Sequence, residues 1–262
     1  MDKLNYKIGI VGSGKMGMQL GILMGLNEYN VLIFSRNAEN ARQKFVKDYL
    51  GKFEGLKLRI LQQNIAFTEN IADLNQTQLI IECVKEDLVV KKQVLEKLLI
   101  KTESLIASCT SSIRLQDLTQ NLSTNGRVNI IHFSNPVSVM KVAEVVYSPK
   151  IQLNDIALIE SLFQMINYKI FVVPDIKGFV INSIIFQMLH KSILLHIEEF
   201  IDMNEIDSLM KLGCGFPMGP FEIIKLIGPD TVIHVLNNLN FHLSVEAIKF
   251  VNSLTEANLR KS

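Results

Sequence analysis

A histidine and a glutamate stand twelve residues apart in the segment HFSNPVSVMKVAEVV. His132 comes at the end of one apolar, strand-like run, and Glu144 lies inside the next. A carboxylate within such a run is costly unless it has a hydrogen-bonding partner. A hydrogen bond between the two side chains would satisfy Glu144, orient the imidazole and stabilise the imidazolium that forms when a proton arrives. A lone histidine is more often structural, but the equally misplaced carboxylate favours an acid–base pair.

A glycine-rich turn near the N-terminus offers a second candidate site. Gly12, Gly14 and Gly17 form a GxGxxG motif that directly follows the run KIGIV and opens a helical pattern. The first glycine permits a tight turn, the second lets backbone amides approach a pyrophosphate, and the third lets the helix pack against the strand. The helix N-terminus, at Lys15 and Met16, favours phosphate charge. The motif therefore predicts a dinucleotide site in preference to a glycine turn without a ligand.

The next strand-like run, NVLIF, ends at Ser35 and Arg36. An NAD-binding protein commonly carries Asp or Glu there, where the carboxylate binds the ribose 2′-hydroxyl. A serine beside an arginine fits a 2′-phosphate better, because the guanidinium can bind phosphate with two parallel hydrogen bonds. The sequence thus favours NADP over NAD, with a solvated arginine as the alternative.

Strand-like and helical patterns alternate through the first two-thirds of the chain and must position these residues. Buried strands are expected at 7–11, 30–34, 79–83, 104–108 and 129–133, and helices at 15–27, 37–53 and 88–102. Strands separated by helices indicate βαβ units and a parallel sheet. Further strands are expected at 141–146 and 169–173, with a helix at 155–167 between them.

The pattern changes near residue 174, after which only helices are expected. They cover 178–200, 204–212, 219–227 and 230–257. We predict an α/β protein with an N-terminal Rossmann-like dinucleotide-binding domain (1–174) and an all-helical C-terminal domain (175–262) for substrate binding and dimerisation. The active site is expected in the cleft between them.

Composition limits the remaining classes of function. Of 262 residues, 48% are hydrophobic and 20% charged, and the net charge is only +1, so no overall field attracts nucleic acid or an anionic membrane. The three cysteines show no metal-binding spacing and indicate a reducing compartment. There is no secretory leader pattern and no run of 18 apolar residues. We therefore expect a cytoplasmic protein without a metal site.

Five segments, in order and with compatible spacing, resemble the L-3-hydroxyacyl-CoA dehydrogenase family, which includes 3-hydroxybutyryl-CoA dehydrogenases. The segment HFSNPVSVMKVAEVV is similar to the family's "HFFNP…MKLVEV", and SCTSSI to its "NTSS" loop. The others are IECVKEDLVVKKQVL (81–95), DIKGFVINSI (175–184) and GCGFPMGPFEIIKLIGPD (213–230). The resemblance implies an oxidoreductase of fatty acid metabolism that interconverts 3-hydroxyacyl and 3-oxoacyl thioesters with NAD or NADP.

The resemblance also implies roles for individual residues. His132 would be the general base in oxidation and the general acid in reduction, with Glu144 as its partner. Ser111 and Asn182 would hydrogen-bond the reacting oxygen or the thioester carbonyl, although serine-rich loops and asparagine caps are common without such a role. Glu86 and Lys91 would lie beside the cofactor and the substrate.

This sequence departs from the family pattern at several positions. Cys109 replaces an asparagine, Ser134 an aromatic residue, Ser183 an arginine and Lys225 an aspartate. The helical hairpin expected between Ser35 and Ile65, which contacts the CoA end of the substrate in the family, is shortened. The chain ends near Lys261, before the family's "GxGFYxY" tail. These differences affect the acyl carrier, the chain length and the subunit packing.

Two alternatives follow from these departures. One is a related dehydrogenase that acts on an acyl-carrier-protein thioester or a free hydroxy acid in a biosynthetic pathway. The other is a dinucleotide-binding relative without catalysis, which the joint presence of His132, Glu144, Ser111 and Asn182 disfavours. A homodimer is expected through the apolar helix 178–200, which carries Phe179, Ile184, Ile185, Met188, Leu189, Leu194 and Leu195.

Overall fold

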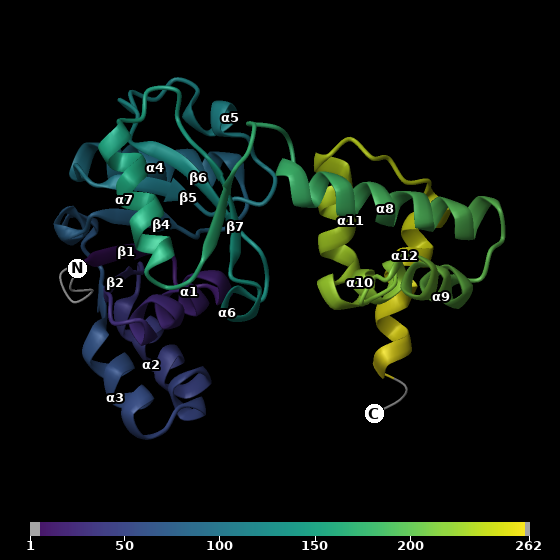
Figure 1. Cartoon of the computed structure of the whole chain (residues 1–262), viewed down its shortest axis with the longest axis horizontal. Coiled ribbons are helices and arrows are strands. Elements are labelled where there is room, and N and C mark those ends of the chain that lie inside the picture. The colour runs from purple at the N-terminus through teal and green to yellow at the C-terminus, as the bar shows by residue number, and fades with distance from the viewer. Residues whose placement is uncertain (1–5, 260–262) are drawn as a thin grey trace. The chain divides into compact units, whose positions relative to one another are not determined.

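The computed structural model describes the backbone of residues 6–259 and the side chains of residues 6–254. The chain divides into two compact units, residues 1–175 and 176–262 (Figure 1). The first unit is a sheet flanked by helices and the second is helical. This confirms the predicted fold class, a Rossmann-like α/β domain followed by a helical domain.

A single sheet organises the first unit, with eight strands in the order β3-β2-β1-β4-β5-β6-β7-β8. The order places β1 and β4 side by side, so the chain reverses its direction of winding there, at the point where open α/β sheets bind their ligands. The strands are β1 (Lys7–Val11), β2 (Asn30–Phe34), β3 (Ile65–Thr68), β4 (Leu79–Glu82), β5 (Leu105–Ser108), β6 (Val128–Phe133), β7 (Val142–Val146) and β8 (Lys169–Val172).

The sheet is mixed, which corrects the expected parallel arrangement. Strands β1 to β6 run parallel, but β7 pairs with β6 in the antiparallel direction, and β8 is parallel to β7. A parallel crossover needs a dozen or more residues. Only a short segment containing the single-turn helix α6 (Val137–Met140) separates β6 from β7, so the chain has to turn back.

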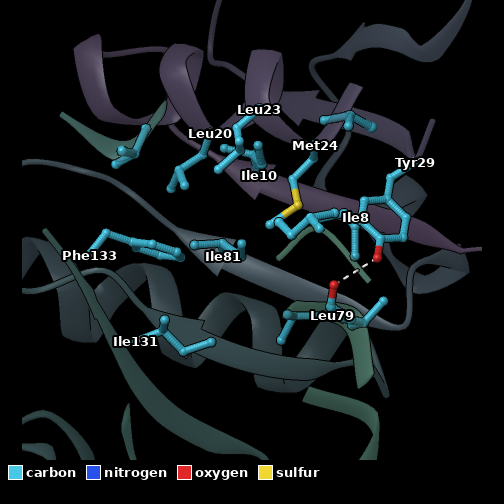
Figure 2. Close-up of a cluster of buried hydrophobic side chains, with 14 of the residues drawn as sticks. Ile8, Ile10, Leu20, Leu23, Met24, Tyr29, Leu79, Ile81, Ile131 and Phe133 are labelled. Carbon is cyan, nitrogen blue, oxygen red and sulfur yellow. Dashed lines mark hydrogen bonds between the residues drawn. The ribbon is translucent and has the colours of Figure 1, made fainter. Parts of the chain in front are cut away.

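Apolar side chains from strands and helices form the core of the first unit. Helix α1 (Lys15–Leu26) packs Leu20, Leu23 and Met24 against Ile8 and Ile10 of β1, as Figure 2 shows. The Tyr29 hydroxyl, buried in the same cluster, donates a 2.7 Å hydrogen bond to the carbonyl of Leu162 in α7 (Leu153–Gln164). This hydrogen bond ties the connection between α1 and β2 to α7, far along the chain.

The other helices of this unit are α2 (Ala38–Asp48), α3 (Gly55–Asn64), α4 (Leu88–Lys101) and α5 (Leu115–Thr119), with 3-10 turns η2 (Leu50–Lys52) and η3 (Ile71–Gln76). The expected helix at 37–53 ends in η2, and α3 with strand β3 was missed. The helical hairpin between Ser35 and Ile65 is therefore present as α2 and α3; its length relative to the family stays a prediction.

The second unit contains α8 (Phe179–Glu198), α9 (Met203–Cys214), α10 (Pro220–Ile227), α11 (Pro229–Asn238) and α12 (Val245–Leu259). Phe186, Leu189 and Ile193 of α8 pack into its core. The helix predicted over 230–257 is broken between α11 and α12. By length and composition α8 would also be able to cross a membrane, a test that a buried core helix passes as well.

Candidate active site

The antiparallel pairing of β6 and β7 sets His132 directly opposite Glu144. Residues opposite one another in such a pair point to the same face of the sheet. His132 Nδ1 lies 2.9 Å from Glu144 Oε2, and the two residues are only 8% and 2% exposed. Because a carboxylate can only accept a hydrogen bond, this contact places a proton on Nδ1. The imidazole is thereby oriented with Nε2 on the opposite side of the ring.

The three glycines of the turn meet different physical demands. Gly12 has φ +111°, and a Cβ there would lie 2.8 Å from the carbonyl oxygen of Cys83. A Cβ on Gly17 would overlap the carbonyl oxygen of Gly12, so only glycine lets α1 approach the strand. A Cβ on Gly14 would meet nothing within 4 Å, which leaves the backbone at the N-terminus of α1 accessible. Lys15 and Met16 form the first turn of that helix.

A cavity of about 750 Å³ lies over the carboxyl ends of β1, β2 and β4 and fits a dinucleotide. Its wall combines the glycine turn with residues that follow those strands. They are Val11, Gly12, Ser13, Gly14, Phe34, Ser35, Arg36, Glu69, Asn70, Ile71, Cys83, Val84, Lys85, Val90, Gln93, Val94 and Lys97. An open turn with accessible amides, followed by a helix N-terminus, is suited to a pyrophosphate.

Ser35 and Arg36 both line this cavity, as expected, but an acid lies close by. The hydroxyl oxygens of Ser13 and Ser35 are 3.1 Å apart, which links the glycine turn to the end of β2. Glu69, just after β3, accepts a 2.8 Å hydrogen bond from the backbone N–H of Ala38 at the start of α2. The adenosine end of the cavity therefore carries one arginine and one glutamate.

Glu86 organises the serine-rich loop that contains Ser111. Its Oε1 accepts hydrogen bonds from the Thr110 hydroxyl at 2.6 Å and from the backbone N–H groups of Ser111 and Ser112 at 3.0 and 3.1 Å. Burial acts to raise the pKa of Glu86, but Lys91 and these hydrogen bonds outweigh it and lower the pKa below the ordinary range. A charged Glu86 thus holds Ser111 at the same sheet edge as His132.

Lys91 is fully buried and binds two carboxylates. Its Nζ lies 3.0 and 3.1 Å from the two oxygens of Glu82, and 3.5 Å from Glu86 Oε2. Burial acts to lower the pKa of Lys91, but Glu82 and Glu86 together raise it above the ordinary range, so the ammonium stays charged. Its Nζ also lies 3.5 Å from the carbonyl oxygen of Val84, which lines the cavity.

Asn182 belongs to the second unit, in the first turn of α8. Gly178, with φ +73°, is the N-cap residue of that helix. The structure brings together His132 with Glu144, and Ser111 with Glu86 and Lys91. The contribution of Asn182 to the same site stays a prediction.

Sequence reasoning overlooked three residues that the structure places here: Glu69, Glu82 and Thr110. The signal for Glu82 was present, because it is a carboxylate inside the strand-like run LIIEC, as Glu144 is in its own run. Thr110 and Glu69 carry no such signal, since polar residues after a strand are common in loops.

This arrangement can bind a dinucleotide and move a proton beside it. The turn and the α1 N-terminus hold phosphates, and the buried pair His132–Glu144 can take or give a proton near the same sheet edge.

Two family models match the chain. One, described as "3-hydroxyacyl-CoA dehydrogenase, NAD binding domain", matches residues 7–176, and the other, "3-hydroxyacyl-CoA dehydrogenase, C-terminal domain", matches 178–261. A 3-hydroxybutyryl-CoA dehydrogenase of Clostridioides difficile is 30% identical over 250 residues, covering 89% of this chain and 86% of that protein.

Solved structures show the same fold. M. tuberculosis FadB2 has a TM-score of 0.84 at 24% identity, covering 98% of this chain and 95% of that one. The (S)-3-hydroxybutyryl-CoA dehydrogenase PaaH1 from Ralstonia eutropha has a TM-score of 0.81 at 25% identity, covering 96% and 94%.

Proposed function

The chain belongs to the 3-hydroxyacyl-CoA dehydrogenase family, and we propose that it interconverts a 3-hydroxyacyl and a 3-oxoacyl thioester with a nicotinamide cofactor. The observation that carries the mechanism is the 2.9 Å contact between His132 and Glu144 on paired strands. In oxidation, His132 Nε2 takes the proton of the substrate hydroxyl, and Glu144 stabilises the resulting imidazolium. In reduction, the same nitrogen returns the proton to the carbonyl oxygen.

A nicotinamide cofactor, held by the glycine turn and the N-terminus of α1, would supply or accept the hydride. Charge changes on the substrate oxygen as the hydride moves, and placed hydrogen-bond donors stabilise that change. We assign this role to Ser111, which Glu86 holds in place, and to Asn182 of α8. A non-catalytic relative would have no need to keep an oriented His–Glu pair together with these donors.

We propose NADP as the preferred cofactor. In support, Ser35 and Arg36 line the cavity at the end of β2, where an acid would favour NAD. Arg36 can offer a planar, charge-assisted fork to a 2′-phosphate. Glu69 opposes this, but its carboxylate already accepts a hydrogen bond from the N-terminus of α2.

The substrate's carrier is tested by comparing acetoacetyl-CoA, the same acyl group on an acyl carrier protein, and free acetoacetate. The proposal predicts turnover of a thioester and at most trace turnover of the free acid. Efficient reduction of the free acid, with no reduction of either thioester, would contradict this proposal and would support a dehydrogenase that acts on a free hydroxy acid.

Shortening the carrier from CoA to a pantetheine is expected to cost little kcat/KM. If the α2–α3 hairpin is shortened as predicted, it offers less surface for the adenosine end of CoA, so few remote contacts can help the reacting centre. The measurement is kcat/KM on acetoacetyl-CoA and on acetoacetyl-pantetheine. A loss of about a hundredfold, on the order of 2.7 kcal/mol, would show a complete adenosine site.

We further propose a C2 homodimer formed through the second unit. Apolar side chains of α8 are exposed to solvent in the single chain: Ile184 is 65% exposed and Val180 is 38% exposed. Light scattering should give about twice the 29.6 kDa chain mass at micromolar concentration. Ile184→Glu should give monomer, whereas Leu153→Glu, at an even more exposed apolar position in the first unit, should not. A monomeric wild type would refute the proposal.

We place the protein in the cytoplasm. Its three cysteines are free thiols, which fits a reducing compartment. Fractionation of the source cells, with the protein followed by antibody, should find it in the cytoplasmic fraction; recovery with membranes or outside the cell would overturn this.

A further inference from the structure

Three charged residues form a buried cluster beneath the carboxyl end of β4. Glu82 and Lys91 are fully buried, and Glu86 has a side chain that is 26% exposed. Glu82 accepts hydrogen bonds from Lys91, from the Ser108 hydroxyl at 2.5 Å and from the N–H of Val84 at 2.7 Å. Because every one of these partners donates, Glu82 is a carboxylate. Two carboxylates and one ammonium leave one excess negative charge.

The neighbouring thiol does not change this count. Cys83 is half-buried and forms a hydrogen bond with Cys109; this hydrogen bond and the loss of solvation raise the pKa of the Cys83 thiol well above its ordinary value. Cys83 therefore remains neutral, and the cluster keeps its single negative charge.

The cluster adjoins the side of the cavity where the nicotinamide would lie, because Cys83, Val84, Lys85 and Val90, its neighbours in the chain, line that cavity. In a Rossmann-like fold the pyrophosphate lies at the glycine turn and the adenosine at the end of β2. The other half of the dinucleotide must then extend toward β4 and β5. Cys83 and Val84, next to Glu82 in the chain, line the cavity on that side, and Glu86 reaches from the same loop to Thr110 and Ser111.

We propose that Glu82, acting through Lys91 and Glu86, is a positioning residue that sets the relative affinity for the oxidised and reduced cofactor. The oxidised nicotinamide ring carries a positive charge and the reduced ring carries none. A fixed negative charge in a low-dielectric interior therefore stabilises the oxidised form selectively. Lys91 contacts both carboxylates but carries only one positive charge, so Glu82 leaves the cluster with one excess negative charge, and Glu86 is its partly exposed end.

The test measures the dissociation constants of the oxidised and reduced cofactors separately, by isothermal titration calorimetry without substrate. Glu82→Gln keeps the size of the side chain and makes the cluster neutral. The ratio of the oxidised to the reduced dissociation constant should rise on the order of tenfold, which is about 1.4 kcal/mol. ADP-ribose or its 2′-phosphate, which lacks the ring, should bind both proteins equally.

A second substitution separates charge from structural damage. Adding Lys91→Gln to Glu82→Gln leaves Glu86 as the only charge, which restores the net charge of −1. The ratio should return toward the wild-type value, although two buried groups have been changed. Ser108→Ala removes a hydrogen bond to Glu82 without changing the charge, and should leave the ratio unaltered. A purely structural role would weaken both cofactor forms alike and would leave the ratio constant in every variant.

If Glu82→Gln does not fold, Glu86→Gln makes the same change of charge at the partly exposed end of the cluster and should shift the ratio in the same direction. A constant ratio in the folded variants, or no recovery in the double variant, would overturn the inference. It rests on the cofactor part of the proposed function: a protein that binds neither cofactor form would contradict that function itself, whereas binding with an unchanged ratio would contradict only this inference.

Discussion

Replacing His132 with alanine is expected to lower kcat for a 3-oxoacyl thioester by about 10²–10⁴-fold, the usual contribution of general acid–base catalysis. The affinity for the cofactor should change little, because the dinucleotide cavity is lined by other residues. The reason for the large effect is geometric: His132 is oriented by Glu144 at 2.9 Å. The measurements are steady-state kcat and the dissociation constant of the reduced cofactor.

Glu144→Ala should also lower kcat far more than it weakens cofactor binding, since the imidazole loses both its orientation and its partner for the charged form. Glu144→Gln keeps the size of the side chain and tests charge alone. His234→Ala, which changes an exposed histidine of the second unit, is the matched control and should keep its kcat. If His132→Ala retained most of its kcat, His132 would not be the acid–base catalyst.

The double variant Ser35→Asp, Arg36→Ile is expected to shift cofactor preference toward NADH by roughly ten- to a hundredfold, about 1.4–2.7 kcal/mol. In the wild type we expect NADPH to be preferred. Arg36 would give the 2′-phosphate a charged hydrogen bond, which contributes about 1.5–3 kcal/mol. The new aspartate would instead repel that phosphate and bind the 2′-hydroxyl. The measurement is kcat/KM with NADPH and NADH in both proteins.

Glu69 provides the matched control for this experiment. It lines the same part of the cavity and carries the opposite charge. Glu69→Gln should therefore move the preference further toward NADPH, opposite to the double variant. A wild type that favours NADH, or a double variant with an unchanged ratio, would show that Arg36 points into solvent and that the carboxylate of Glu69 decides the preference.

The pairing of His132 with Glu144 could be predicted from the sequence, because a charged side chain inside an apolar run is costly without a partner wherever the run lies. That argument needs no knowledge of the partner strand, and it predicted a hydrogen bond between His132 and Glu144. The direction of β7 was not foreseen, although the short connection after β6 already ruled out a parallel crossover. Periodicity describes each strand separately, whereas the pairing that brings the two side chains together depends on the length of the connection.

The buried cluster of Glu82, Glu86 and Lys91, by contrast, could not be assembled from the sequence. Glu86 and Lys91 were identified from the family resemblance as neighbours of the cofactor, but Glu82 was passed over in an equally apolar run. The structure shows Lys91 held between Glu82 and Glu86. Only the fold reveals this, because the register of β4 and the start of α4 decide which carboxylates the lysine reaches.

Boundaries were the least predictable feature. Strand β3 spans only Ile65–Thr68, beside the apolar residues of α3, and such a short run cannot be separated from a helix by periodicity. Likewise the segment between α11 and α12 contains no proline or glycine to mark the break. The glycine turn, by contrast, was predictable in detail because its three positions have distinct steric demands.

The central claim is that this chain uses His132 to exchange the proton of a 3-hydroxyacyl thioester. The most direct measurement is the reduction of acetoacetyl-CoA with NADPH and with NADH, in the wild type and in His132→Ala. Cofactor oxidation is followed by absorbance, and the product by mass spectrometry. We expect the wild type to form one 3-hydroxybutyryl-CoA for each cofactor oxidised, and His132→Ala to bind both ligands but turn them over about 10²–10⁴-fold more slowly. A wild type that binds the cofactor but reduces no 3-oxoacyl thioester would contradict the account.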